Sequence, residues 1–535
     1  MLKPLTLEQA EWVERTLANL SIEERVGHLL CPEDRNYSPD DWAAILRDVP
    51  LGCVFLANNP PERWRACVEA IQSNARTPIL IASDLEHGAG CMIEGCTDFP
   101  WSMAAGAANS PELMTAMGRA TAIEGRQHGV HWTFSPVVDL NVNFQNPVTN
   151  VRSLGDQPEP VARLATAWIT GMQESGLLAA TAKHFPGDGM DDRDQHLCTT
   201  VNSKPFGEWM QTYGQVWKAV ISAGVMSIMC GHISLPDYEG LAGDPAAALP
   251  ATLSPRLQID LLRKELGFDG VIVSDAAPMI GIASRVRSDQ AAIRNILAGS
   301  DVYLFAEPRR DFKRLMGAVQ SGAISTERAT QSARRVLEMK ARLGLHHGVF
   351  GPAPTPGQRE QFHRDAQAMA DRSITLARAN PVTPVKLAPG ARILTVTIRH
   401  VGARQELSKE LAVVDEELRR RGFQVDHLLN PDCERLITAA GDYDAVFVNL
   451  VHTPHALIGT IRLTGEVAMP FWRAFWVDHS NAVFTSFGSP YHLYELPHLP
   501  NMLLAYGPSE FSQRAAVKVW LGEQDAKGRC PVALA

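Results

Sequence analysis

Short apolar runs rich in β-forming residues recur up to residue 307, and each is followed by a stretch with helical periodicity. The eight runs span residues 26–31, 52–58, 78–84, 131–140, 179–185, 224–233, 270–276 and 301–307. Strands that are apolar throughout and alternate with helices form parallel sheets, because the crossover helices cover both faces of the sheet. Eight of them favour closure into a (β/α)₈ barrel, with an open doubly wound sheet as the competing arrangement.

A Pro- and Gly-rich stretch, GVFGPAPTPGQRE, follows the helical sequence that ends near His347 and is typical of an interdomain connection. Beyond it, five further apolar runs alternate with helical stretches, which indicates a smaller αβα sandwich. We therefore predict a barrel over residues 1–350, a linker with a connecting helix over 351–390, and a C-terminal sandwich over 391–535.

Charge and hydropathy exclude several classes of partner. The 50 Lys and Arg residues against 59 Asp and Glu residues give a net charge of −9 without a basic run, so we expect no nucleic-acid partner. No apolar stretch reaches the roughly 18 residues that a membrane span needs, and the N-terminal sequence lacks the pattern of a secretory signal. A small, neutral substrate fits this composition best, and the oligomeric state is left open.

The nine cysteines are odd in number, scattered, and often lie within apolar runs, so we interpret them as free thiols in a reducing compartment. This interpretation predicts a cytoplasmic protein. Cys91 and Cys96 lack a second Cys or His pair at metal-binding spacing, and the C-terminal region has no phosphate-binding glycine motif. We therefore expect neither a metal nor a cofactor.

Polar side chains stand at the ends of the apolar runs, where a barrel places its active site. These residues are Asp84, Asp139, Lys183, His184, His232 and Asp275. Each alone is compatible with a cap or a satisfied core group, but six together favour a site. The segment 183–196, KHFPGDGMDDRDQH, contains two histidines and four aspartates, with glycines that permit an irregular loop. A solvated acidic loop is the alternative, whereas the spacing of a calcium loop is absent.

The segment 183–196 resembles the KHFPGHG…DSH signature of glycoside hydrolase family 3, in the branch that contains the β-N-acetylglucosaminidases. Four further segments resemble family motifs: SDLEHG (83–88), SPVVDLNVNFQNPVTNVRSLGD (135–156), IMCGHISLP (228–236) and GFDGVIVSDAAPM (267–279). SFGSPYHLYELP and the closing GRCPVAL resemble the family's C-terminal sandwich, so the resemblance covers nearly the whole chain.

The resemblance implies a retaining, exo-acting β-glycoside hydrolase, with β-N-acetylglucosaminidase as the expected activity and a small β-linked carbohydrate as the substrate. Asp275 is implied as the nucleophile and His196, paired with Asp194, as the general acid/base, because a carboxylate orients an imidazole and stabilises its protonated form. The implied sugar contacts are Asp84, Arg152, Lys183, His184 and His232. For Arg152 and Asp84 a structural ion pair is the alternative, and for His232 a packed imidazole at a strand end.

Three positions depart from the family pattern. Asp188 stands where the branch usually has His, Ala276 where a second acidic residue is common, and the stretch after Glu86 lacks the usual Arg.

The missing Arg keeps a β-glucosidase-like specificity open. A phosphorylase is also open, because a neutral imidazole repels phosphate less than a carboxylate does. The non-enzyme alternative is an inactive sugar-binding protein of the same fold. The sequence leaves open whether the sandwich contributes a loop to the active site.

Overall fold

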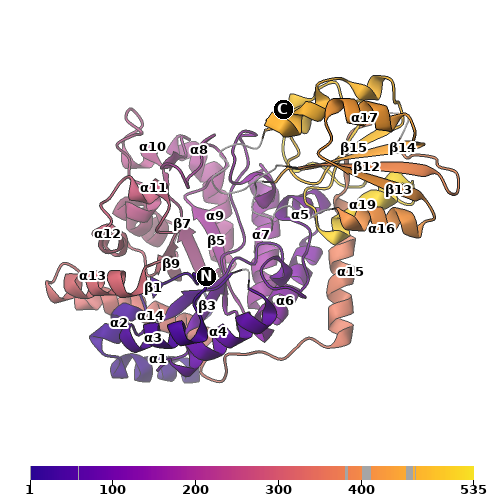
Figure 1. Cartoon of the computed structure of the whole chain (residues 1–535). Helices are drawn as coiled ribbons and strands as arrows, with labels where there is room; N and C mark the ends of the chain where they lie inside the picture. Colours follow the sequence, from indigo (N-terminus) through magenta and orange to yellow (C-terminus); the bar gives the residue numbers. More distant parts are fainter. Residues whose placement is uncertain are drawn as a thin grey trace.

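The computed structural model describes residues 2–57, 59–379, 383–399, 411–453, 462–463 and 465–534 (Figure 1). Its larger part contains eight short parallel strands, each followed by at least one helix. The strands are β1 (Leu30–Cys31), β2 (Cys53–Phe55), β3 (Leu80–Ser83), β4 (Trp132–Thr133), β5 (Ala179–Phe185), β7 (Ser227–Cys230), β9 (Val271–Ser274) and β10 (Tyr303–Leu304). The predicted alternation of strands and helices is confirmed.

Backbone pairing closes these strands into a ring. Six of them pair in the order β2-β3-β4-β5-β7-β9, and β1 pairs with β10, all in parallel. Two parallel bridges join the two sheets, since Glu33 pairs with Phe55 of β2 and Val302 pairs with Val273 of β9. The structure therefore forms the predicted (β/α)₈ barrel and not an open doubly wound sheet.

The barrel strands are buried on both faces, which explains why they read as continuous apolar runs. In β2, Cys53 and Phe55 pack in one core cluster with Trp132 and Phe134, while Val54 between them packs in the cluster that includes the helices. The surrounding helices are α3 (Pro39–Asp48), α4 (Pro61–Ser73), α5 (Ser102–Ala108), α6 (Pro111–Gln127), α7 (Pro158–Gln173), α8 (Phe206–Gln211), α9 (Tyr213–Ser222), a π-helix at Arg256–Glu265, α12 (Ala291–Ala298), α13 (Pro308–Gln320) and α14 (Thr326–Arg342). Before the first strand lie α1 (Leu7–Asn19) and α2 (Ile22–Gly27).

A second sheet of six strands forms the C-terminal part, in the order β11-β16-β15-β14-β12-β13. Five of these strands are the predicted ones: β12 (Arg392–Arg399), β13 (Gln424–Leu429), β14 (Ala445–Val451), β15 (Ala482–Ser486) and β16 (Met502–Leu504). Helices α16 (Ala412–Arg420) and α19 (Glu510–Trp520) lie on one face and α17 (Cys433–Ala440) on the other (Figure 1). The αβα sandwich predicted from the sequence is confirmed.

The segment predicted as a linker with a connecting helix contains a helix and a strand. Helix α15 (Pro356–Ser373) buries Phe362, Ala366 and Met369, and it packs against α5, α6 and α19. The strand after it, β11 (Thr375–Arg378), pairs antiparallel with β16 at the edge of the second sheet. Helix α15 therefore contacts both the barrel and the sandwich, and β11 belongs to the sandwich sheet. The exact domain boundaries stay a prediction.

The sandwich contacts the barrel at the loop after β4. Asn141 Nδ2 donates a hydrogen bond to the Tyr491 hydroxyl at 2.7 Å, and Asn150 Nδ2 donates to Ser489 Oγ at 3.3 Å. The Asp156 amide donates to the Pro531 carbonyl at 3.1 Å. Among the described residues, none of the helices combines the length and the apolar character that crossing a membrane requires.

Candidate active site

Asp275 directly follows strand β9, at the carboxyl-terminal end of the barrel. Its amide donates a hydrogen bond to the Cys230 carbonyl of β7 at 2.8 Å, which fixes the backbone to the neighbouring strand. The Ala276 amide donates to Asp275 Oδ1 at 2.7 Å. The second oxygen, Oδ2, is buried and has no hydrogen-bond partner among the described residues. One oxygen therefore orients the carboxylate, and the other is available to a bound ligand.

Electrostatics keep Asp275 ionised. Burial alone would raise its pKa, but the electrostatic interactions with His184, His232 and His196, together with the hydrogen bond from the Ala276 amide, lower the pKa below the ordinary value of 3.8. His184 and His196 come from β5 and the loop after it, and His232 follows β7, so the fold brings these predicted site residues together around one carboxylate. A nucleophilic carboxylate needs this ionised state.

His232 uses both of its ring nitrogens inside the protein. Nε2 lies 3.0 Å from the Ala276 carbonyl and Nδ1 lies 2.9 Å from the Thr252 hydroxyl. Because a carbonyl only accepts, Nε2 carries the proton and Nδ1 accepts from the hydroxyl. Burial lowers the pKa of His232 and so favours this neutral form. The contacts favour the packed imidazole at a strand end over a direct sugar contact.

Asp194 and His196 form a pair on the loop after β5. Asp194 Oδ1 accepts from the His196 backbone amide at 2.8 Å and lies 2.7 Å from His196 Nδ1. The Asp194 side chain is 1% exposed, whereas the imidazole is 26% exposed. A buried carboxylate therefore holds one ring nitrogen and leaves Nε2 for a proton transfer at the surface of the site.

This loop is attached to the segment that follows Asp275. The Ile280 amide donates to the His196 carbonyl at 3.0 Å, and the Thr199 hydroxyl donates to the Gly281 carbonyl at 2.7 Å. A Cβ on Gly281 would lie 2.6 Å from the Gln195 carbonyl oxygen, so only glycine permits this close approach. The predicted acid/base pair and the predicted nucleophile are thereby held on contacting segments.

His184 is held by a second buried aspartate, Asp139. Asp139 Oδ2 lies 2.7 Å from His184 Nδ1, and Oδ1 accepts from the amides of His184 and Asp188 at 3.1 and 2.7 Å. Burial and the neighbouring Asp139 raise the pKa of Asp188, the position where the sequence departs from the family, to about 6. Asn146 Nδ2 donates to Asp188 Oδ1 at 2.9 Å.

Four charged side chains, Asp84, Glu86, Arg152 and Lys183, form a chain of ion pairs. Lys183 Nζ donates to Asp84 Oδ1 at 2.9 Å and lies 2.7 Å from Glu86 Oε1. Arg152 donates to both oxygens of Glu86, at 2.9 Å from Nε and 2.7 Å from Nη2. The partner of Arg152 is therefore Glu86, and the ion pair between Arg152 and Asp84 considered from the sequence is not the direct contact.

Glu86 is the charged centre of this group. Burial would raise its pKa, but Arg152 and Lys183 hold it well below the ordinary value. In return, the nearby carboxylates outweigh burial and raise the pKa of Lys183. Glu86 is not among the site residues predicted from the sequence. The motif SDLEHG does contain a signal for it, because Glu86 is the acidic residue at the fourth position.

The chain matches the model of the Glycosyl hydrolase family 3 N terminal domain over residues 21–339. A "Beta-N-acetylglucosaminidase/beta-glucosidase" of Cellulomonas fimi is 32% identical over 97% of this chain and 95% of the relative. The solved structure "Beta-glucoside phosphorylase BglX bound to 2FGlc" superposes with a TM-score of 0.88 at 30% identity, over 99% of this chain and 97% of the other. A glycoside hydrolase family 3 beta-N-acetylglucosaminidase from Paenibacillus sp. str. FPU-7 superposes with a TM-score of 0.85 at 26% identity, over 96% and 99%.

The family model covers the whole strand series from β1 to β10, and the matches at 30% identity and above extend through the sandwich. The resemblance found in the motifs at 83–88, 183–196 and 267–279 is therefore confirmed. On the combined grounds of barrel, sandwich and family model, this chain belongs to glycoside hydrolase family 3.

Proposed function

We propose that the chain is a retaining, exo-acting β-glycoside hydrolase that acts as a β-N-acetylglucosaminidase. One observation carries this proposal. The ionised Asp275 has a carboxylate oxygen without a partner among the described residues, and the Asp194–His196 pair is attached to the segment that follows it. A carboxylate and a proton donor on adjoining segments are what double displacement at an anomeric carbon requires.

In the first step, Asp275 Oδ2 attacks the anomeric carbon while the bond to the leaving oxygen breaks. Protonated His196 transfers its Nε2 proton to that oxygen. In the second step, neutral His196 removes a proton from water, and the water oxygen attacks the anomeric carbon and releases Asp275. The two inversions give net retention, and Asp194 stabilises the imidazolium in both steps.

The sugar-binding roles follow from the charged groups around β5. Asp84, Lys183, Arg152 and His184 contact the hydroxyl groups of the non-reducing sugar. Glu86 holds Arg152 and Lys183 in place through its three ion-paired contacts. His232 positions the Ala276 carbonyl, and with it the backbone after Asp275, so its role is to support the nucleophile.

The names of the relatives support a substrate with an acetamido sugar and are also compatible with a glucoside. The Cellulomonas fimi relative carries both activities in its name. The test is to compare kcat/KM for an aryl β-N-acetylglucosaminide with that for the matching aryl β-glucoside. A higher value for the acetamido substrate is expected. A preference for the glucoside would assign the chain to the β-glucosidases, and no turnover of either would favour the inactive sugar-binding protein.

Phosphorolysis is the second candidate, because the acid/base is an imidazole and a β-glucoside phosphorylase is 30% identical over nearly the whole chain. A neutral imidazole leaves less negative charge facing an incoming phosphate than a carboxylate would. The deciding measurement is product analysis with and without inorganic phosphate. Free sugar as the main product in both supports the hydrolase, and a sugar 1-phosphate that forms in proportion to phosphate supports the phosphorylase.

Replacing His196 with alanine is expected to lower kcat/KM for an alkyl glycoside by ~10²–10⁴-fold, because the leaving alkoxide then departs without a proton. A dinitrophenyl glycoside should lose much less, since its leaving group needs no acid. With the dinitrophenyl glycoside, added azide should restore turnover of the variant and give the β-glycosyl azide. The exposed neighbour Asp192→Asn is the control and should keep wild-type rates for both substrates. Equal losses with both leaving groups would contradict the acid/base role.

A further inference from the structure

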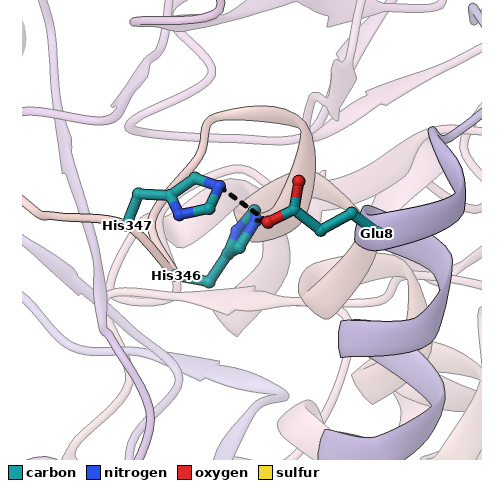
Figure 2. Close-up of side chains that lie close together, drawn as sticks. All are labelled: Glu8, His346 and His347. Carbon is teal, nitrogen blue, oxygen red and sulfur yellow. Dashed lines mark ion pairs between the residues drawn. The ribbon is translucent and has the colours of Figure 1, made fainter.

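Three potential metal ligands meet far from Asp275, where α1 begins and α14 has just ended. Glu8 lies in the first turn of α1, and His346 and His347 lie in the turn that follows α14. Figure 2 shows both imidazoles directed toward the Glu8 carboxylate. His347 Nε2 is 3.2 Å from Glu8 Oε1, and His346 Nε2 is 4.0 Å from the same oxygen. One ligand atom from each residue lies within 4.8 Å of the others.

His346 is the member of this group that needs a partner. Its side chain is 7% exposed, and neither ring nitrogen has a hydrogen-bond partner among the described residues. Its ring stacks on Trp12 with 5.3 Å between centroids and lies 3.9 Å from the ring of His347. Leaving a buried polar group without a partner costs free energy, so such a group calls for an explanation.

We propose that Glu8, His346 and His347 form a binding site for a divalent transition-metal ion, with Zn²⁺ as the reference ion. Imidazole nitrogens and a carboxylate oxygen are typical zinc ligands, and three protein ligands leave a fourth position for water. Ligand bonds of ~2.1 Å in a tetrahedral site place the ligand atoms roughly 3.4 Å apart. A separation of 4.0 Å is too long for a direct hydrogen bond, but a small rotation of the exposed Glu8 side chain brings it to this value.

The surrounding contacts hold the ligands in place before an ion binds. Gln9, next to Glu8, donates from Nε2 to the Ala341 carbonyl of α14 at 3.1 Å. The turn is closed by hydrogen bonds from the Leu345 amide to the Lys340 carbonyl at 3.0 Å and from the His347 amide to the Gly344 carbonyl at 2.9 Å. The helix start and the turn that carry the ligands are therefore fixed before an ion binds, so little backbone entropy is lost on binding.

A bound ion would connect the N-terminal helix to the end of the barrel's last helix. In a (β/α)₈ barrel, the helices run back from the catalytic end, so the end of α14 lies at the face opposite to Asp275. The expected consequence is therefore stability and not catalysis. Such a site departs from the sequence-based expectation of no metal, which was based on the cysteine spacing and the absent calcium-loop pattern.

The test uses the untagged full-length chain after treatment with a chelator. Titration with Zn²⁺ against a chromophoric competitor should show one equivalent bound, and Co²⁺ should give the visible absorption of a tetrahedral site. Zn²⁺ should also raise the midpoint of thermal unfolding. His347→Ala and Glu8→Gln should each weaken binding about tenfold or more and abolish the thermal shift. Both side chains are more than half exposed, so neither variant should impair folding.

His498→Ala removes an exposed histidine elsewhere and is the matched control, which should bind Zn²⁺ like the wild type. Two results would overturn the proposal. One is a wild-type chain that binds no stoichiometric ion, which would leave a plain ion pair between Glu8 and His347. The other is binding that persists unchanged in both His347→Ala and Glu8→Gln, which would place the ion elsewhere.

Discussion

Replacing Asp275 with alanine is expected to reduce kcat for an aryl β-N-acetylglucosaminide by at least ~10⁴-fold, because the glycosyl-enzyme can no longer form. Fold and binding should survive, since only one Asp275 oxygen accepts a hydrogen bond and its donor, the Ala276 amide, is the adjacent residue. The circular dichroism spectrum should therefore remain that of the wild type.

Azide provides a sharper test than loss of rate. In Asp275→Ala, azide has room to attack the face of the sugar that the carboxylate occupied, and it should give the α-glycosyl azide, the inverted product. His196→Ala should instead give the β-azide, so the two variants differ in product stereochemistry. The control is Asp269→Asn, an exposed carboxylate just before β9, which should keep full activity. Asp275→Ala with more than about a tenth of wild-type kcat would exclude the proposed nucleophile.

Replacing Lys340 with methionine is expected to raise the free energy of unfolding by about 2 kcal/mol at pH 7. Lys340 lies in α14, is fully buried, and its Nζ is 3.1 Å from His28 Nε2. His28 Nδ1 lies 2.7 Å from the Glu24 carbonyl and therefore carries the proton, so Nε2 accepts. The hydrogen bond to a neutral imidazole offsets little of the free energy lost when an ammonium group is buried. Methionine has a similar volume without the charge.

The pH dependence follows from the same burial, which lowers the pKa of Lys340 from 10.5 to about 8. Between these values the unfolded chain holds a proton that the folded protein has released, so stability rises with pH through this window. Below about pH 8 both states are protonated and the full penalty of roughly 3 kcal/mol is present. The loss of one hydrogen bond to His28 reduces the net gain expected for methionine.

The measurement is the urea midpoint of the barrel transition, followed by tryptophan fluorescence between pH 7 and 10. The stability difference between Lys340→Met and the wild type should be largest at pH 7 and shrink toward pH 10. Lys313→Met, at an exposed position of α13, should change neither the midpoint nor its pH dependence. A destabilised Lys340→Met, or a difference independent of pH, would show that Lys340 is not a buried charge with a lowered pKa.

Periodicity predicted the strands well where both faces are buried and the backbone is straight. The run 179–185 is strand β5 with the same ends. The run 131–140 contains only two strand residues, Trp132 and Thr133, because Pro136 has no amide hydrogen to donate to a neighbouring strand. In the run 26–31, Val26 and Gly27 lie in α2, since Ser21 and Glu24 form a capping box that starts a helix there. Hydropathy does not register such local hydrogen bonds.

The contacts within the candidate site could be predicted only in part: Asp194 pairs with His196 as expected, whereas the contacts of Glu86 were not predicted. Strand-end positions identified Asp84, Lys183 and Asp275, because a parallel barrel collects these ends on one face. That Glu86 joins Arg152 to Lys183 depends on how two loops from different strands meet, which no local pattern encodes. The metal-site candidate shows the same limit, since Glu8 and His347 come from opposite ends of the barrel sequence.

The contact between the two domains is expected to determine how the enzyme loses activity on heating. Tyr491 and Ser489 of the sandwich hold Asn141 and Asn150 in the loop that leads to Arg152. If the sandwich melts or undocks first, this loop loses its outer support while the barrel strands are still paired. Heat inactivation would then precede barrel unfolding, and the lifetime of the active enzyme would be set by the stability of this domain interface, which also packs Met103, Ala104 and Val151 in one apolar cluster with the sandwich.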